Sequence, residues 1–358
     1  MLNSGDQIRF CSSRDGTRIA YAMRGSGPPL LWAPHWVHHL KFASESPIWS
    51  PWLDLLSRHH ALVRYDCRGC GLSDRDNLDF SFERHIEDLE AVVAAVGWER
   101  FVFFGYGSGG ATGVAYVARK PEKVERLALI GSPVRGRLAR AATPGDIVEA
   151  ETRLKVFEIG WASDAPAYGD FIAALHMPDA SADQMHAYKD LLRLTTSPAT
   201  ALKLLRGYWQ ADVYDVVRRI HCPTLVCHAR LDALIPFEQG RLFASLIPGA
   251  RFVPLETRNH VLLDSEPAWL QFAAALDEFL PQKPAPADFA LGELTARERQ
   301  ILDAIAEGLS NKAIASRFGT REKTVRNQVS TILSKLGVNS RAQAIVQARD
   351  AGFGRSSR

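Results

Sequence analysis

Short apolar runs recur through the first three quarters of the chain, at residues 29–33, 61–66, 101–105, 127–131, 224–229 and 251–256. Most are followed by a stretch with helical spacing, and this rhythm is typical of strands buried in a parallel sheet flanked by helices. Residues 8–23, with Asp15-Gly16 at their centre, predict an antiparallel hairpin. Residues 134–215 interrupt the strand pattern with helical, aromatic-bearing stretches at 154–161, 168–176 and 202–209. We therefore predict an α/β domain with a helical insertion.

The pattern changes after residue 290, where four short helical segments follow one another between 294 and 348. The third has apolar residues at i, i+4, i+7, i+8 and i+11, as a helix packed on a small core requires; they are Val325, Val329, Ile332, Leu333 and Leu336. Its other face carries side chains that bind phosphates and base edges, namely Lys323, Arg326, Asn327, Ser330 and Ser334. One face predicts a core contact and the other predicts DNA recognition.

The boundaries of these four helices are also marked. Capping boxes are predicted at two pairs, Thr295 with Glu298 and Ser340 with Gln343. Further N-caps are predicted at Ser310 and Thr320, and helix ends are predicted at Gly308, Gly319, Gly337 and Gly352. A tight turn at Gly319 gives a helix-turn-helix arrangement, in which the later helix enters the major groove.

This segment resembles the LuxR-type (GerE-like) DNA-binding domain through its LT-RE, LSNK-IA, TV-N-V and KLGV-SRAQA motifs, which occur in that order. The resemblance implies a four-helix module whose last helix, residues 340–351, pairs with its twin in a homodimer. It places three residues against bases (Arg326, Asn327 and Ser330) and four against phosphates of double-stranded DNA (Lys312, Lys323, Thr324 and Lys335). It also suggests RNA polymerase as a partner. The family more often has His at the position of Gln328. The alternative is a solvated charged helix in an ordinary bundle.

Residues from about 6 to 280 resemble an α/β-hydrolase. Residues 66–74, DCRGCGLSD, are similar to the family's D-x-R-G-x-G-x-S turn, and 101–110, FVFFGYGSGG, occupy its nucleophile elbow. CHARLDALIP places Asp232 at the acid position, and ETRNHVLL places His260 at the triad histidine. The fold class expected is thus an α/β-hydrolase fold with a cap insertion, followed by a small all-α helix-turn-helix domain.

The elbow departs from the family pattern. With Gly105 and Gly109 as the two small residues, the nucleophile position falls on Gly107. Glycine adopts the strained elbow conformation without a Cβ clash, so the fold is expected to survive. Ser108 is the alternative nucleophile, but that register puts Tyr106 at a position that must be small. A second departure lies in WAPHW, where Pro34 and His35 stand at the family's His-Gly motif.

Without a nucleophile, the remaining Asp and His cannot form an acyl-enzyme. We expect a non-catalytic site for a small, largely apolar ligand, made by Asp232, His260, Gly107 and the backbone N–H groups of Ser108 and Trp36. Three alternatives stay open. The pair survives only as packing residues; His260 or Ser108 retains catalysis; or the large domain recruits a protein partner.

Composition supports two domains, because 358 residues with 46% hydrophobic content suffice for one large core and a small second one. Expected boundaries are 1–280 for the hydrolase-like domain, 281–290 for a linker that begins PQKPAPAD, and 291–358 for the DNA-binding domain. The net charge is +3, but residues 288–358 carry 12 Lys and Arg against 7 Asp and Glu. The basic excess therefore lies where DNA contact is predicted.

Other features exclude several protein classes. No apolar run is long enough to span a bilayer and no signal-peptide layout begins the chain, so we expect a cytoplasmic protein that does not bind membranes. Five cysteines predict free thiols. The histidines at 35, 38, 39, 59 and 60 lack the spacing of a metal site, and a surface or cap location is expected for them. Neither a metal nor a cofactor is expected.

Overall fold

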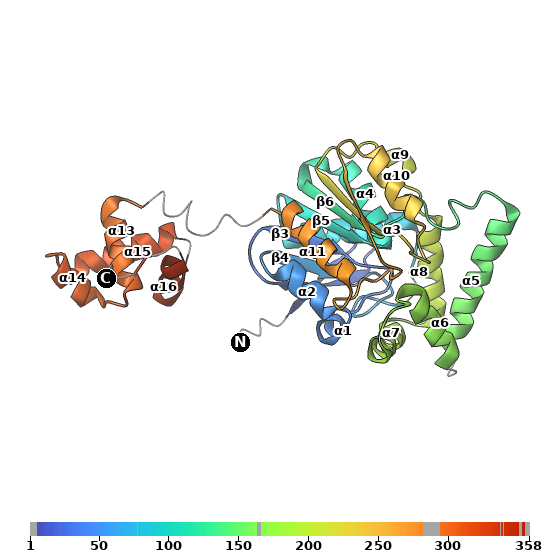
Figure 1. The fold of residues 1–358 in the computed structure, drawn as a ribbon, viewed down its shortest axis with the longest axis horizontal. Helices are drawn as coiled ribbons and strands as arrows, with labels where there is room; N and C mark the ends of the chain where they lie inside the picture. Colours follow the sequence, from blue (N-terminus) through green and yellow to red (C-terminus); the bar gives the residue numbers. More distant parts are fainter. Residues whose placement is uncertain are drawn as a thin grey trace. The chain divides into compact units, whose positions relative to one another are not determined.

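The computed structural model describes residues 6–76, 78–162, 166–281, 294–336, 338, 340–350 and 353–354. Contacts within the chain divide it into two compact units, 1–281 and 282–358 (Figure 1). Apart from Pro281, the expected linker lies outside the described residues. Each unit has an apolar core of its own.

The larger unit is built on an eight-stranded sheet with the order β1-β2-β4-β3-β5-β6-β7-β8. The strands are β1 (Gln7–Ser12), β2 (Arg18–Arg24), β3 (Pro29–Ala33), β4 (Ala61–Tyr65), β5 (Phe101–Tyr106), β6 (Val124–Ile130), β7 (Thr224–Ala229) and β8 (Arg251–Leu255). β1 and β2 form the predicted antiparallel hairpin, and β3 to β8 pair in parallel. All six predicted strands are present, with ends that differ by a few residues.

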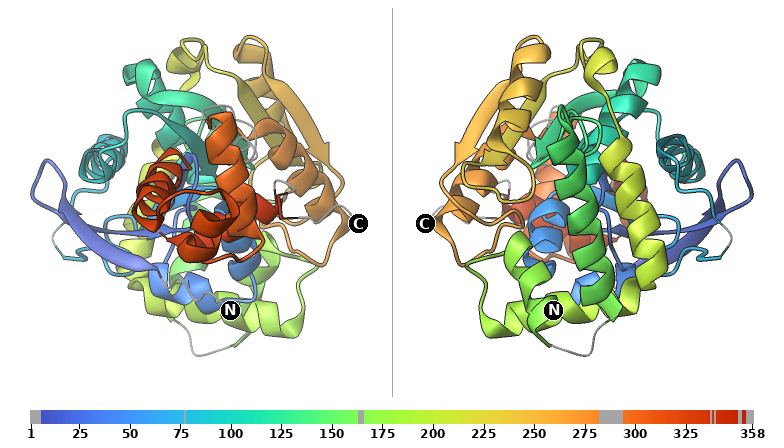
Figure 2. Two further views of the ribbon diagram at one scale, coloured as in Figure 1. Left: turned by 90° about the vertical axis from the view of Figure 1, so that its left-hand side faces the viewer. Right: turned by 90° about the vertical axis from the view of Figure 1, so that its right-hand side faces the viewer.

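Helices cover both faces of this sheet, in agreement with the apolar character of its strands (Figures 1 and 2). The helices are α1 (Leu40–Glu45), α2 (Ser50–Ser57), α3 (Phe82–Val96), α4 (Ser108–Arg119), α10 (Phe237–Leu246) and α11 (Pro267–Phe279). Neighbouring residues of β5 show the two faces, because successive side chains point to opposite sides. Phe103 packs at Gly113 of α4, whereas Phe104 contacts Trp52 of α2 and Phe272 of α11.

The insertion between β6 and β7 is helical, as predicted. Its helices are α5 (Pro144–Ala162), α6 (Pro166–His176), α7 (Ala182–Thr195), α8 (Pro198–Gln210) and the short α9 (Tyr214–Val217). The three predicted stretches fall within α5, α6 and α8, whereas α7 has no counterpart among the predicted elements. Backbone bonds join the two ends of the insertion, since Val213 N donates to Val134 O at 3.0 Å and Gly136 N donates to Ala211 O at 2.8 Å. We call this insertion the cap.

The smaller unit contains α13 (Ala296–Ala306), α14 (Asn311–Arg317), α15 (Glu322–Lys335) and α16 (Arg341–Asp350). Its core includes Ile301, Ile305, Ile314, Val325 and Ile332, which are at most 1% exposed. The small core follows the predicted apolar stripe of α15, and four of that stripe's five residues are buried.

The predicted helix ends are mostly correct. The capping box of Thr295 and Glu298 is present, and Ser310 accepts from the backbone N–H of Ala313. Ser340 accepts from the N–H of Gln343 at 3.3 Å, as the second capping box predicts. The prediction for Thr320 is wrong, because α15 begins one residue later and its N-cap, Arg321, makes no side-chain capping bond.

Glycines end the first two of these helices. Gly308 and Gly319 have φ of +87° and +61°, where an L side chain would be strained. Gly337 and Gly352 lie outside the described residues. Throughout the described parts of the chain, every helix is too short or too polar to span a membrane.

Candidate functional site

Two predicted site residues meet at the carboxyl ends of β7 and β8. Nδ1 of His260 lies 2.6 Å from Oδ2 of Asp232, and both side chains are almost fully buried. Oδ1 of the same carboxylate accepts from the backbone N–H groups of Leu234 and Ile235, at 2.8 and 3.0 Å. Burial alone would raise the pKa of Asp232, but the His260 charge and hydrogen bond outweigh it and leave that pKa lowered. The carboxylate therefore fixes the orientation of the imidazole.

Gly107 forms the turn between β5 and α4, and its backbone has φ +53° and ψ −123°. A Cβ placed on Gly107 would lie 3.5 Å from Nε2 of His260, so a side chain here would be directed at the histidine. The same Cβ would lie only 2.5 Å from Cδ2 of His35. That distance is shorter than any ordinary van der Waals contact. His35 thus fills the space that a side chain at Gly107 would need.

His35 follows β3 and is 5% exposed. Its ring lies 5.2 Å from that of His260 and 5.4 Å from that of Tyr106, between centroids. Burial, with the nearby His260 and His176, holds the pKa of His35 well below its usual value, so the ring is neutral. Within the described parts of the chain, Nδ1 of His35 and Nε2 of His260 have no hydrogen-bond partner.

The expectation that the histidine run lies on the surface or in the cap is therefore wrong for His35. It is also wrong for His38, which is 3% exposed and pairs through Nδ1 with Oδ1 of Asp66 at 2.9 Å. The surrounding aromatic rings bury both histidines, and contacts with residues distant in the chain cannot be read from local spacing. His60 is buried as well, whereas His59 is exposed.

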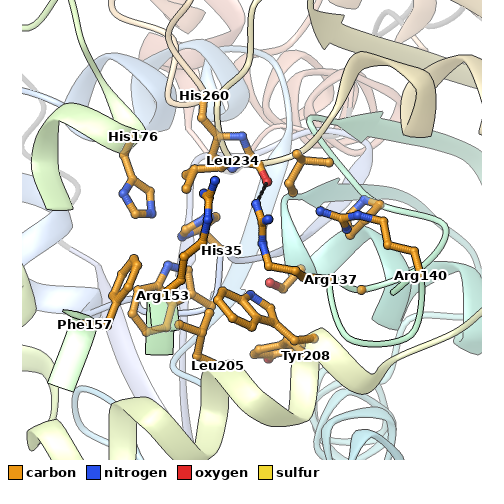
Figure 3. A pocket seen from close by; sticks show the side chains of 16 residues that line it. His35, Arg137, Arg140, Arg153, Phe157, His176, Leu205, Tyr208, Leu234 and His260 are labelled. Atoms are coloured by element: carbon orange, nitrogen blue, oxygen red, sulfur yellow. Dashed lines mark hydrogen bonds between the residues drawn. The ribbon is translucent and has the colours of Figure 1, made fainter. Parts of the chain in front are cut away.

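A pocket opens between the cap and the ends of the strands, with about 600 Å³ of empty space including the solvent at its mouth (Figure 3). Of the five expected ligand-binding residues, Trp36, Ser108 and His260 line it. Asp232 is hydrogen-bonded to the lining residue His260, and Gly107 lies against the lining residue His35. The other lining residues are His35, Pro133, Gly136, Arg137, Arg140, Arg153, Phe157, His176, Leu205, Tyr208, Trp209, Leu234 and Ile235.

Sequence reasoning missed the three arginines of this pocket. Two of them belong to RGRLAR at 135–140, a basic cluster directly after a predicted strand, which was a usable signal. Of the aromatic residues in the cap, Phe157 and Trp209 line the pocket. Trp161 lines a smaller neighbouring pocket, and Phe171 is 48% exposed.

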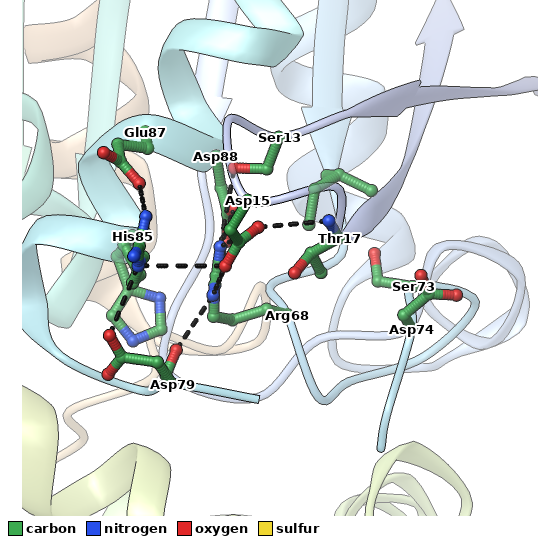
Figure 4. Close-up of polar contacts among 12 residues, drawn as sticks. Ser13, Asp15, Thr17, Arg68, Ser73, Asp74, Asp79, His85, Glu87 and Asp88 are labelled. Carbon is green, nitrogen blue, oxygen red and sulfur yellow. Dashed lines mark hydrogen bonds and ion pairs between the residues drawn. The ribbon is translucent and has the colours of Figure 1, made fainter. Parts of the chain in front are cut away.

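The Asp66–Asp74 turn supports the loop that carries His35. Asp66 accepts from His38, from Leu40 N and from Leu72 N, each at 2.9 Å. Arg68 is buried and donates to both carboxylate oxygens of Asp88, at 2.8 and 2.6 Å, and to Asp15 at 2.8 Å (Figure 4). The turn is thus a scaffold for the neighbouring loops.

All five cysteines are free thiols, as predicted. Burial raises the pKa of the Cys67 thiol to about 12 and that of Cys70 well above its usual value. A buried, protonated thiol is a poor nucleophile and a poor metal ligand. In the described residues, no group of three or more His, Cys, Asp and Glu side chains is arranged to hold a metal ion.

The polar face of α15 is exposed, opposite its buried apolar stripe. The exposed residues include Lys323, Thr324, Arg326, Asn327 and Ser330. Lys312 is exposed on α14. These six residues, which we call the polar face, are free of the core and lie where the helix-turn-helix arrangement presents side chains to DNA.

Lys335 differs from the other predicted phosphate contacts. Its Nζ lies 2.8 Å from Oε2 of Glu298, and its side chain is 30% exposed. Glu298 is the capping-box residue of α13, so this ion pair ties the end of α15 to the start of α13. Lys335 has a structural contact in addition to the predicted contact with DNA.

Comparison with known proteins gives two family matches. A model described as alpha/beta hydrolase fold matches residues 42–267, and one described as bacterial regulatory proteins, luxR family, matches residues 292–348. The chain is 30% identical over 253 residues to the putative carbamate hydrolase RutD of Pseudomonas syringae, which covers 66% of this chain and 89% of that protein. It is 27% identical over 255 residues to a non-heme haloperoxidase of Rhodococcus erythropolis, covering 68% and 89%.

The C-terminal region matches a different protein. The DNA-binding transcriptional activator DevR/DosR of Mycobacterium tuberculosis is 36% identical over 124 residues, which cover 34% of this chain and 54% of that protein. Among solved structures, a hydrolase from Pseudomonas aeruginosa superposes with a TM-score of 0.64 at 23% identity, covering 77% of this chain and 99% of that one. This last likeness concerns the fold alone.

Proposed function

The chain belongs to the α/β-hydrolase fold family and carries a LuxR-type DNA-binding domain, and we propose that its hydrolase-fold domain is a non-catalytic receptor for a small molecule. The occupied receptor controls how the second domain binds DNA. In this proposal the DNA-binding unit acts as a homodimer through α16, and the polar face contacts the duplex.

The arrangement of Gly107 and His35 carries the proposal. A triad needs an attacking oxygen, and the histidine and its acid can only activate one that is present. Gly107 supplies no side chain toward His260, and His35 fills the space that such a side chain would need. Both departures from the hydrolase motif fall at one point in space, although they are 72 residues apart in the sequence.

The groups that remain favour binding. Nδ1 of His35 and Nε2 of His260 are buried polar atoms without partners in the described structure. Leaving such an atom unsatisfied costs about 1–3 kcal/mol, which a ligand hydroxyl, amide or carbonyl would recover. Apolar side chains line the same pocket, among them Phe157, Leu205 and Trp209. A polar end within an apolar cavity is the usual design of a small-molecule site.

A ligand changes DNA binding only if its affinity differs between two arrangements of the protein. The cap is the element positioned to respond, because α5 and α8 contribute several pocket residues and pack on each other. Closure of the cap on a ligand is a change of the kind that switches other proteins.

A turnover assay tests the non-catalytic part. Purified protein is expected to hydrolyse p-nitrophenyl acetate and butyrate no faster than its His260→Ala variant. Hydrolysis that is lost in His260→Ala or Ser108→Ala would instead establish an enzyme joined to a regulator. The double variant Gly107→Ser/His35→Gly restores a hydroxyl and the space for it, and we expect it to gain esterase activity that Gly107→Ser alone lacks.

Ligand binding is tested by thermal unfolding of the full chain. A molecule that binds only the folded state raises its stability by about 2.7 kcal/mol at a concentration 100 times Kd. Mass spectrometry of small molecules released from purified protein gives the first compounds to test. If no compound changes either Tm or affinity for DNA, the large domain is better explained as a site for a protein partner.

A further inference from the structure

Three arginines line the pocket, and they come from two parts of the cap. Arg137 and Arg140 lie in the segment between β6 and α5, and Arg153 lies on α5. The side chain of Arg137 is 14% exposed and that of Arg153 is 32% exposed. Figure 3 shows the side chains of Arg137 and Arg153 extending toward the part of the pocket where His35 and His260 lie.

Within the described structure, one carboxylate forms ion pairs with two of these arginines. Glu149 lies 3.5 Å from Arg137 and 2.7 Å from Arg153, and it is itself 51% exposed. Arg137 also donates to Leu234 O at 3.1 Å, and Arg140 donates to Arg135 O at 3.0 Å. A buried acid nearby, Asp232, is paired with His260. Three guanidinium groups therefore line the pocket, and the acids that act on them are the half-exposed Glu149 and Asp232, which is already paired with His260.

This clustering of positive charge is costly. Burial lowers the pKa of Arg140 to about 10, and the neighbouring Arg137 charge contributes to the same shift. Burial and the Arg153 charge likewise lower the pKa of Arg137. Guanidinium groups stay charged even so, and partly buried like charges repel one another. An anion placed among them would remove much of this cost.

We propose that the pocket takes an organic carboxylate, whose negative group binds at Arg137, Arg140 and Arg153 and whose apolar body packs against Phe157 and Trp209. The planar fork of arginine matches the two oxygens of a carboxylate. This inference rests on the proposed receptor function and refines its ligand from largely apolar to amphipathic and anionic.

Matched pairs of probes test the charge directly. Wild-type protein is titrated with 4-phenylbutyrate and its primary amide, with hexanoate and its amide, and with phenyl phosphate, by calorimetry and thermal unfolding. We expect at least one carboxylate to bind about tenfold or more tighter than its amide, because charge-assisted hydrogen bonds are the stronger ones. The preference for carboxylate should weaken as salt is added.

Variants locate the effect. Arg153→Gln should reduce carboxylate affinity about tenfold and leave amide affinity unchanged. Arg206→Gln is the matched control, since Arg206 lies on α8 of the same cap and pairs with Glu151 at 2.7 Å, but does not line the pocket. It should bind both probes like the wild type. Arg140→Gln offers a second site if Arg153→Gln unfolds.

Several results would contradict the proposal that the ligand is a carboxylate. The first two are amides that bind as tightly as their carboxylates, and equal effects of Arg153→Gln and Arg206→Gln on carboxylate affinity. The others are tighter binding of phenyl phosphate than of any carboxylate, and no binding of any carboxylate up to its solubility limit. A neutral molecule released from the purified protein would also do so while leaving the receptor function intact. Conversely, a carboxylate that binds but leaves the affinity for DNA unchanged would contradict the proposed receptor function. It would still support the carboxylate site.

Discussion

The two units of this chain keep their family motifs to different degrees. In the smaller unit, the residues of the polar face are all exposed, and most of the apolar stripe of α15 that supports them is buried. In the larger unit, the framework around the site is kept, with Asp66 and Arg68 bonded in the turn and Asp232 bonded to His260. Our proposal places the change at the predicted nucleophile position, where His35 occupies the space beside Gly107.

This difference shows where each kind of function is encoded. A DNA-binding surface is formed by several exposed side chains, so its motif can be followed along a helix. A hydrolase depends on one oxygen at one point, so under the proposed function the substitutions at this point would remove the reaction and leave the fold unaltered. Glycine makes this possible here, because a backbone with φ of +53° suits glycine better than any other residue.

The largest effect is expected when a side chain is returned to the elbow. Gly107→Ser should lower the free energy of unfolding by about 1–3 kcal/mol for the backbone strain and by about 1–3 kcal/mol more for the clash with His35. Gly97→Ser is the matched control, since Gly97 ends α3 with φ of +74° and a Cβ placed on it would meet no atom within 4 Å. Urea unfolding of both variants separates strain from clash.

The additional cost at Gly107 should disappear when His35 is removed. In the double variant Gly107→Ser/His35→Gly, the destabilisation that serine causes should approach that seen at Gly97, as measured by a double-mutant cycle. If Gly107→Ser and Gly97→Ser are equally destabilising, His35 does not occupy the space of the missing side chain. The argument for a blocked site would then fail.

Much of the fold follows from the sequence, because apolar runs and helical spacing are local properties. The six strands, the hairpin at Asp15-Gly16 and the buried stripe of α15 are all predicted in this way. The site is less predictable. Gly107 can be aligned by motif, but the position of His35 within 2.5 Å of its missing Cβ depends on packing between β3 and β5. The arginines of the pocket likewise converge only after the cap folds.

An intermediate effect is expected on the DNA-binding surface, where base contacts and phosphate contacts should separate. Arg326→Ala should cost about 1–3 kcal/mol at the preferred sequence and relax the preference at one base pair. Lys323→Ala should weaken binding to all sequences alike and lower the slope of log affinity against log salt by about one. Fluorescence anisotropy with a selected operator and a scrambled duplex compares the two. The same sequence preference in both variants would contradict a base contact for Arg326.

The smallest effect is expected at Lys335, where the two kinds of evidence compete. The family resemblance predicts a phosphate contact, whereas the structure pairs this ammonium with Glu298. Since the carboxylate already offsets its charge, Lys335→Ala should reduce the salt slope by less than Lys323→Ala does. It should also lower the stability of the helical unit by up to about 1 kcal/mol, the usual range for an ion pair near the protein surface. An equal reduction of slope in both variants would show that Lys335 leaves Glu298 to bind DNA.

The pH dependence of that loss identifies its cause. The hydrogen bond from Lys335 lowers the pKa of Glu298, so the folded state binds its proton less readily than the unfolded state. The ion pair therefore stabilises the protein above the unfolded pKa of about 4.3, and this contribution is lost as the pH falls through the lowered folded pKa. Wild type and Lys335→Ala should differ in urea midpoint at pH 7 and converge as the pH falls through the lowered folded pKa of Glu298. A difference that stays constant as the pH is lowered would instead assign the effect to packing of the lysine's methylene groups against α13.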